Sequence, residues 1–213
     1  MKNIAIYGAG GFGREVACLL NIINEKEPTW NLVGFFDDGK EKDSVNEYGK
    51  ILGGLTDLKN WTDPLNIVIA IGSPRIVKRI VDGVTNPNID FPNIIAPNTV
   101  FLDKDRFTMG RGNLICNGCL FSTNVTVGDF NCFNGSITVG HDATIGNFNS
   151  FMPGIRVSGE VQIKERNYFG VGSIVLQQVK VGSDTVVGAG SVIIRKTKDG
   201  NTYLGNPATI VKY

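Results

Sequence analysis

A single histidine, His141, is the side chain of this 213-residue sequence best suited to acid–base chemistry. It stands in the segment Val139-Gly140-His141-Asp142-Ala143. Histidine is the one side chain whose unperturbed pKa lies near neutrality, so it can take a proton from a reacting group. Asp142 could orient the imidazole or stabilise its charged form. The alternatives are a surface histidine without a chemical role and a simply solvated carboxylate.

A second candidate site is the glycine-rich stretch Gly8-Ala9-Gly10-Gly11-Phe12-Gly13, a GxGxxG sequence between an expected strand and helix. Such a loop lets the backbone approach a phosphate, and the helix N-terminus adds amide groups and partial positive charge. Asp37 and Asp38 end the next expected strand, where a carboxylate can bind a ribose hydroxyl. We predict a nucleotide or nucleotide-sugar site. A dinucleotide site and a purely structural glycine turn are the alternatives, and the segment holds only one of the two halves that a dinucleotide needs.

The residues that must position His141 form a repeat from Met109 to about Lys198, in which an apolar residue returns at every sixth position. The series is Met109, Ile115, Phe121, Val127, Phe133, Val139, Ile145, Phe151, Val157, Ile163, Phe169, Val175, Val181, Val187 and Ile193. A period of six fits neither a helix nor an isolated strand, so it predicts a short strand and a corner, repeated.

A longer period shows how many sides the repeat has. Four asparagines recur at a spacing of eighteen, at Asn113, Asn131, Asn149 and Asn167. Three hexads therefore make one coil, which predicts a three-sided solenoid. Glycine often follows the apolar residue, as at Gly110, Gly128 and Gly140, where a corner needs φ > 0 or close backbone approach.

The segment that carries the glycine loop alternates between strand and helix patterns. Strands are expected over 2–8, 31–38 and 66–73, helices from 13 to about 24 and from 74 to about 82, and a short fourth strand over 91–96. This pattern is typical of a half-sized doubly wound α/β unit. We therefore divide the chain into a Rossmann-like domain over residues 1–95 and a solenoid with a C-terminal cap over 96–213.

Composition limits the possible partners and compartments. A net charge of +1 gives no electrostatic reason to expect nucleic acid or an anionic membrane. The sequence contains neither a membrane-length apolar run nor the apolar region of a signal peptide, so we expect a cytoplasmic protein. Cys116 and Cys119 form a CxxC inside one hexad, but no second CxxC or nearby histidine completes a metal site. We expect these two, with Cys18 and Cys132, to be free thiols, and the protein to need no metal.

The hexad run resembles the hexapeptide-repeat acyltransferases, whose parallel β-helix is left-handed, an exception to the usual right-handed crossover. The segments 6–13, 35–38 and 69–73 resemble the strand ends that form the nucleotide-sugar pocket of the PglD/NeuD-type sugar acetyltransferases, and this resemblance covers essentially the whole chain. Members commonly carry histidine near positions 12 and 96, where this chain has Phe12 and Ala96. The resemblance implies a left-handed β-helix after the α/β half, acetyl-CoA as co-substrate, and a homotrimer with each site between two prisms.

The resemblance also implies roles for individual residues. His141 and Asp142 match the catalytic GH(D/E) step, so His141 takes the proton of the acceptor as it attacks acetyl-CoA, without an acyl-enzyme. Expected acceptor contacts are Gly8, Gly10, Gly11, Phe12 and Gly13 at the diphosphate, Asp37 and Asp38 at the ribose or sugar, Gly72 and Ser73 at the base, and Ser150 on the coil next to His141 and beneath the same face. Expected CoA contacts are Gly154, Gly159, Arg195, Lys196, Gly205 and Pro207.

The predicted function is acetyl-CoA-dependent N-acetylation of a nucleotide-linked amino sugar, of the UDP-4-amino-sugar type, in bacterial surface glycan biosynthesis. The alternatives are a sialic acid or other sugar O-acetyltransferase, a serine- or xenobiotic-type hexapeptide acetyltransferase, and a ligand-binding solenoid that is not an enzyme. A γ-class carbonic anhydrase shares the solenoid but needs three histidines per zinc, and one histidine per chain excludes it.

Overall fold

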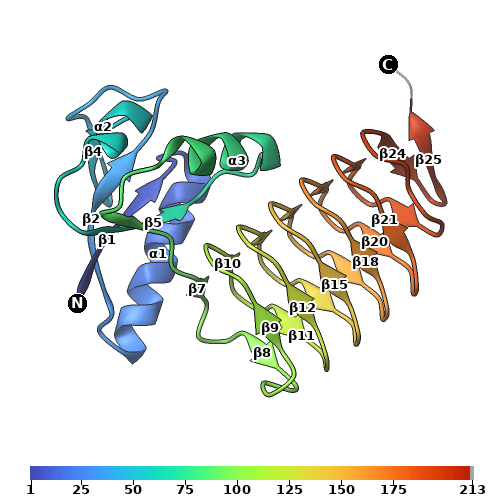
Figure 1. Ribbon diagram of the computed structural model, residues 1–213. Coiled ribbons are helices and arrows are strands. Elements are labelled where there is room, and N and C mark those ends of the chain that lie inside the picture. Colours follow the sequence, from blue (N-terminus) through green and yellow to red (C-terminus); the bar gives the residue numbers. More distant parts are fainter. Residues whose placement is uncertain (212–213) are drawn as a thin grey trace.

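The computed structural model describes residues 1–211, which form an α/β domain docked against one side of an elongated, three-sided solenoid (Figure 1). The solenoid extends away from the α/β domain, and its last coil lies at the far end from that domain. Within the described residues, no helix is long and apolar enough to cross a membrane. The predicted order of an α/β half followed by a parallel β-solenoid is confirmed.

The α/β domain is built on one six-stranded sheet with the strand order β3-β4-β2-β1-β5-β6. All neighbouring strands are parallel except the β3–β4 hairpin. Its elements are β1 (Lys2–Tyr7), α1 (Gly11–Lys26), β2 (Trp30–Phe36), β3 (Val45–Asn46), β4 (Gly49–Gly53), α2 (Leu55–Lys59), β5 (Leu65–Ile69), α3 (Pro74–Gly83) and β6 (Ile89–Asp90). The hairpin, α2 and β6 lie outside the strands and helices expected from the sequence.

The solenoid has three sheets, which we call faces 1, 2 and 3 in chain order, and their strands are parallel except in the C-terminal hairpin of face 1. Face 1 contains β7 (Ile94–Ile95), β10 (Leu114–Ile115), β13 (Cys132–Phe133), β16 (Ser150–Phe151), β19 (Tyr168–Phe169), β22 (Val186–Val187) and the capping hairpin β24 (Thr202–Gly205) and β25 (Ala208–Val211). Face 2 contains β8 (Val100–Phe101), β11 (Leu120–Phe121), β14 (Thr138–Val139), β17 (Arg156–Val157), β20 (Ile174–Val175) and β23 (Val192–Ile193). Face 3 contains β9 (Thr108–Met109), β12 (Thr126–Val127), β15 (Thr144–Ile145), β18 (Gln162–Ile163) and β21 (Lys180–Val181).

One predicted strand belongs to a different sheet. Residues 91–96 do not add a fourth strand to the α/β unit, because Ile94 and Ile95 pair with Leu114 and Ile115 of the solenoid. The partners of this first coil are twenty residues apart, whereas Met109 and Val127 on the next side are eighteen apart. Two extra residues before Met109 therefore shift the hexad register and hide the first coil in the sequence.

The solenoid interior confirms the hexad pattern. Apart from the partly buried Met109, the series points inward and is buried, and the rings of Phe133, Phe151 and Phe169 stack at centroid separations of 4.8 and 4.7 Å. The asparagines of period eighteen form a buried ladder. Asn149, for example, donates its backbone N–H and its side-chain amide to Oδ1 of Asn131 at 2.9 and 3.0 Å.

The corner glycines are needed for close packing between coils and not for a positive φ. A Cβ on Gly140 would lie 2.6 Å from the backbone nitrogen of Gly159, and one on Gly146 would lie 2.7 Å from the carbonyl oxygen of Lys164. These glycines therefore allow close approach between coils. Positive φ falls two residues later, at positions such as Asp142 and Phe148, with φ of 58° and 56°.

The α/β domain packs on face 1 and on the edge between faces 3 and 1. Val16 and Leu20 of α1 share one buried cluster with Leu114 and Cys132 of face 1. Along the edge, Phe130 and Phe148 stack with ring centroids 5.3 Å apart, and Phe91 meets Phe130 edge-on at 5.3 Å. The Lys78 ammonium of α3 lies 5.6 Å from the centroid of Phe148. Face 2 and the edge between faces 2 and 3 point away from this contact.

Candidate active site

His141 lies on the edge between faces 2 and 3, in the corner that joins β14 to β15. The backbone carbonyl of His141 accepts a hydrogen bond from the N–H of Glu160 on the next coil at 2.8 Å, and Asp142 donates its N–H to Thr123 on the preceding coil at 3.0 Å. Both neighbouring coils therefore fix this corner. The imidazole projects outward, and 48% of the side chain is exposed.

A chain of hydrogen bonds orients the imidazole. His141 Nδ1 lies 2.8 Å from Asp142 Oδ2, and Asn124 Nδ2 donates to Asp142 Oδ1 at 2.6 Å. The hydrogen bonds from Asn124 and His141 lower the pKa of Asp142, so its carboxylate is ionised and can only accept. In the neutral imidazole, Nδ1 then donates to this carboxylate, and Nε2 has the free electron pair that a base requires.

Gly159 lies directly against the imidazole. A Cβ at this position would stand 2.4 Å from His141 Nε2 and 2.6 Å from Cε1, so only glycine leaves the ring in place. The sequence suggested Gly159 as a CoA contact and gave no sign of this packing. Asn124 was also missed, because it is seventeen residues from His141 and only the coil repeat brings it beside Asp142.

The glycine loop joins the end of β1 to the start of α1. A Cβ on Gly8, which has φ of 110°, would lie 2.7 Å from the Ala70 carbonyl oxygen, and one on Gly13 would lie 1.8 Å from the Gly8 oxygen. Around Gly10 and Gly11, in contrast, a Cβ would meet nothing within 4 Å. Two glycines therefore serve the fold, and two leave open space in front of the helix N-terminus. Phe12 is half-buried against the cluster that α1 forms with face 1.

The two predicted ribose-binding carboxylates already hold the loops around the sheet's carboxyl edge. Asp37 Oδ2 accepts from Ala9 N–H at 2.8 Å, and its Oδ1 accepts from Gly39 N–H at 2.8 Å. Asp38 accepts from the Tyr7 hydroxyl at 2.7 Å and from Leu55 N–H at 2.8 Å. Burial and the neighbouring Asp38 raise the pKa of Tyr7, so that hydroxyl keeps its proton. Hydrogen bonds thus hold both carboxylates in place at the carboxyl edge of the sheet.

Ser150 is not on the face where the sequence placed it. It lies in β16 on face 1, between Cys132 and Tyr168, and is only 2% exposed, whereas His141 is on the edge opposite face 1. The hexad register alone does not say which outward residues a neighbouring domain covers. Gly72 and Ser73 follow β5 and face the same side of the solenoid, with the Met152 methyl group 3.7 Å from a Cβ built on Gly72.

Three of the predicted CoA residues come together at the C-terminal end. Arg195, Lys196 and Pro207 line one cavity of about 370 Å³ beside the capping hairpin, and Gly205 is the last residue of β24. Gly154 lies apart from them, on the edge between faces 1 and 2, and Gly159 lies under His141.

The four cysteines are free. Burial raises the pKa of Cys116 to about 12 and that of Cys119 to about 11. No group of three or more His, Cys, Asp or Glu side chains within residues 1–211 could hold a metal ion.

Comparison with known proteins identifies relatives over both halves of the chain. The family described as the PglD N-terminal domain matches residues 3–84. Comparison with curated proteins finds no match. Among solved structures, the acetyltransferase domain of PglB from Neisseria gonorrhoeae FA1090 is 30% identical with a TM-score of 0.89, and the alignment covers 99% of this chain and 100% of that one. The same domain in complex with acetyl coenzyme A is 29% identical with a TM-score of 0.87, covering 99% of each chain.

Two further solved structures extend the comparison. WeeI from Acinetobacter baumannii AYE is 28% identical with a TM-score of 0.87, covering 99% of this chain and 100% of that one. A mutant of perosamine N-acetyltransferase from Caulobacter crescentus, in complex with CoA and GDP-perosamine, shares the fold at 23% identity and a TM-score of 0.88, covering 100% of this chain and 98% of that one. Because the identity with the PglB domain extends over the whole length of both chains and the N-terminal half matches separately, this chain belongs to the PglD/NeuD-type acetyltransferases with a left-handed β-helix.

Proposed function

We propose that the protein transfers the acetyl group of acetyl-CoA to the amino group of a nucleotide-linked sugar, with a UDP-4-amino-4,6-dideoxy sugar as the first choice, in bacterial surface glycan biosynthesis. The observation that carries this proposal is the outward-facing His141, whose Nδ1 lies 2.8 Å from Asp142 Oδ2 and whose Nε2 is thereby left to act as the base. Relatives that bind acetyl coenzyme A and GDP-perosamine support the choice of donor and acceptor class.

His141 is the general base in a direct transfer. The acceptor nitrogen attacks the thioester carbonyl carbon while Nε2 takes a proton from that nitrogen. The carbon–sulfur bond then breaks, and the thiol of CoA leaves with a proton returned by the imidazolium. The Asp142 carboxylate stabilises the imidazolium through Nδ1–H, and Asn124 holds that carboxylate in place. No acyl-enzyme forms, because His141 acts on the acceptor and not on the acetyl group.

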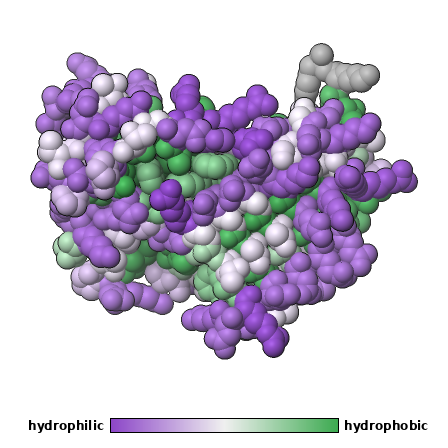
Figure 2. All heavy atoms as spheres, in the orientation of Figure 1, coloured by the Kyte–Doolittle hydropathy of each residue, from purple (hydrophilic) through white to green (hydrophobic). Residues whose placement is uncertain are grey.

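Two copies of the chain are needed to form one site. The glycine loop and Gly72 belong to the domain that covers face 1, whereas His141 stands on the edge opposite that face. An acceptor held by the α/β domain therefore meets the His141 of another copy. The outward side of face 2 supports such an assembly, because Val100, Leu102, Leu176 and Ile194 expose 45%, 63%, 42% and 40% of their surface there. On the side of the solenoid that Figure 2 shows, residues of high and intermediate hydropathy form a band. We propose a homotrimer.

The donor lies along the edge that carries His141 and reaches the cavity lined by Arg195, Lys196 and Pro207 at the end of the solenoid. Two cationic side chains beside an apolar hairpin suit a molecule with phosphates at one end and an apolar arm. The thioester then lies next to Gly159 and the imidazole above it.

Replacement of the base tests the proposal. We expect His141→Ala to lower kcat by roughly 10²–10⁴ with the affinity for acetyl-CoA retained, because the imidazole acts on the acceptor. Steady-state kinetics with UDP- and GDP-linked 4-amino-4,6-dideoxyhexoses and calorimetry with acetyl-CoA give the two readouts. Unchanged turnover of the variant would remove His141 from the mechanism.

A further inference from the structure

A cavity of about 670 Å³ lies between the α/β domain and the C-terminal coils of the solenoid. One wall is the segment Gly72–Arg75, at the carboxyl end of β5 and the start of α3. The other wall is the outward side of face 1, where Met152, Tyr168 and Val186 form the floor. The cavity is thus built by both domains of one chain, and it does not include His141, the glycine loop or the cavity at the C-terminal end.

The strand order decides which part of an acceptor reaches this cavity. At the carboxyl edge of the sheet, β2 ends at the carboxylates Asp37 and Asp38, β1 beside it ends at the glycine loop, and β5 on the far side ends at Gly72. If the ribose binds at the end of β2 and the diphosphate at the end of β1, the end of β5 is left for the group on the far side of the diphosphate, which is the sugar. Adjacent strands are about 4.8 Å apart, so β2 and β5 lie about 10 Å from each other, far enough to separate a ribose from a sugar on the other side of the diphosphate.

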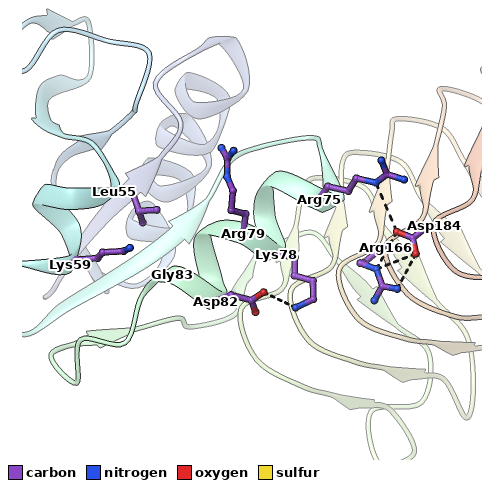
Figure 3. A pocket seen from close by; sticks show the side chains of 9 residues that line it. All are labelled: Leu55, Lys59, Arg75, Lys78, Arg79, Asp82, Gly83, Arg166 and Asp184. Atoms are coloured by element: carbon purple, nitrogen blue, oxygen red, sulfur yellow. Dashed lines mark hydrogen bonds and ion pairs between the residues drawn. The ribbon is translucent and has the colours of Figure 1, made fainter. Parts of the chain in front are cut away.

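The lining of the cavity suits a sugar ring with an apolar side. Met152 and Val186 offer aliphatic surface, and Tyr168 adds an aromatic ring with a hydroxyl group. At the rim, Arg166 forms an ion pair with Asp184 at 2.9 Å (Figure 3). It forms a second with Glu165 at 2.6 Å, so its charge is paired. The Arg75 side chain is 78% exposed, and its Nε reaches Asp184 only at 3.9 Å. Arg75 therefore remains available at the side where the diphosphate would end.

We propose that this cavity binds the hexose of the nucleotide-linked acceptor, and that Met152, Tyr168 and Val186 select a deoxygenated amino sugar over a fully hydroxylated one. The inference rests on the proposed function. It places the sugar of the acceptor beside Gly72 and Ser73, where the sequence suggested the nucleotide base. Face 1 of the solenoid thus determines which sugar the α/β domain of the same chain can bind. The amine points to the cavity mouth, toward the edge of a second copy that carries His141.

Val186→Trp tests the assignment, since residue 186 is outward-facing and 39% exposed, so that an indole fills the cavity without entering the solenoid core. The matched control is Thr108→Trp, at the equivalent strand position of face 3 on the first coil. Calorimetry uses two probe pairs, GDP-perosamine with GDP and UDP-4-amino-4,6-dideoxyglucose with UDP. The pair that the wild-type protein binds more tightly is carried forward to the variants, and thermal unfolding verifies that they are folded.

We expect Val186→Trp to weaken the binding of the nucleotide sugar by at least about tenfold, which corresponds to about 1.4 kcal/mol. The affinities for the free nucleoside diphosphate and for acetyl-CoA should be unchanged. Tyr168→Leu should weaken the binding of the nucleotide sugar alone, and Thr108→Trp should change none of the three affinities. An equal loss of nucleoside diphosphate and nucleotide sugar, or unchanged sugar binding in both face 1 variants, overturns the cavity assignment while the proposed function stands. If the wild-type protein binds neither nucleotide sugar, the proposed function itself fails, and this inference with it.

Discussion

A methyl group on Gly159 should disable the enzyme without unfolding it. In Gly159→Ala the new carbon would lie 2.4 Å from His141 Nε2, whereas non-bonded contacts lie at about 3.5–4.0 Å. The ring must therefore move by about 1 Å or more, and a misplacement of about 1 Å can cost 10²-fold in rate, or about 2.7 kcal/mol in activation free energy. Because 48% of the His141 side chain is exposed, the ring can swing outward, and we expect the stability of the variant to change by less than about 0.5 kcal/mol.

The assay is kcat at saturating acetyl-CoA and nucleotide sugar, with urea unfolding as the control for stability. A double variant separates the cause, because Gly159→Ala should have no further effect on kcat in a His141→Ala background if the methyl group acts through the imidazole. A fully active Gly159→Ala enzyme would refute the reasoning. Weaker acetyl-CoA binding with normal kcat would instead identify Gly159 as a CoA contact that does not position the base.

Three further predictions follow from other parts of the molecule. Gly10→Leu should abolish nucleotide-sugar binding and leave acetyl-CoA affinity intact in calorimetry, because a Cβ there meets nothing within 4 Å and so disturbs only a ligand; equal loss of both ligands would indicate a folding defect. Asn149→Ala should lower the free energy of unfolding in urea by roughly 2–6 kcal/mol, since two buried donors of Asn167 lose their acceptor, and a loss as small as that of the exposed Asn124→Ala would contradict the ladder's role. Iodoacetamide at pH 8 should modify the exposed Cys18 first. Burial raises the pKa of Cys116 to about 12 and that of Cys119 to about 11, and the reactive thiolate fraction of a thiol falls as the pH drops below its pKa. Rapid modification of Cys116 or Cys119 in peptide mass spectra would contradict this prediction.

The sequence predicted the solenoid because one physical requirement repeats in it. Each short strand must bury one residue, so the apolar period of six survives from Met109 to Ile193 whatever the outward residues are. The period of eighteen was equally visible, because each asparagine amide bonds to the one on the previous coil. The first coil escaped detection because two extra residues before Met109 interrupt the period.

The surroundings of the site were less predictable, because they depend on contacts between residues far apart in the chain. The sequence identified His141 and Asp142 as neighbours, but the packing of Gly159 under the imidazole follows from the stacking of coils. Ser150 is outward in the hexad register, yet it is buried on face 1, next to Cys132, which shares a buried cluster with α1 of the α/β domain. A period shows which residues point out of the solenoid, and only the docked domain decides which of those remain exposed.

The docking of the α/β domain is itself encoded in residues that a local reading would reject. Phe130 and Phe148 have φ of 54° and 56°, a conformation that costs a residue other than glycine roughly 1–2 kcal/mol. At the equivalent corner of the preceding coil stands Gly112, where a Cβ would lie 2.4 Å from the Phe130 ring. Two strained aromatic residues are retained where α3 and Phe91 pack on them, since the buried rings offset the strain. The same docked domain brings Gly72 beside face 1, where the Met152 methyl group lies 3.7 Å from a Cβ built on Gly72 and both residues line the cavity proposed for the sugar.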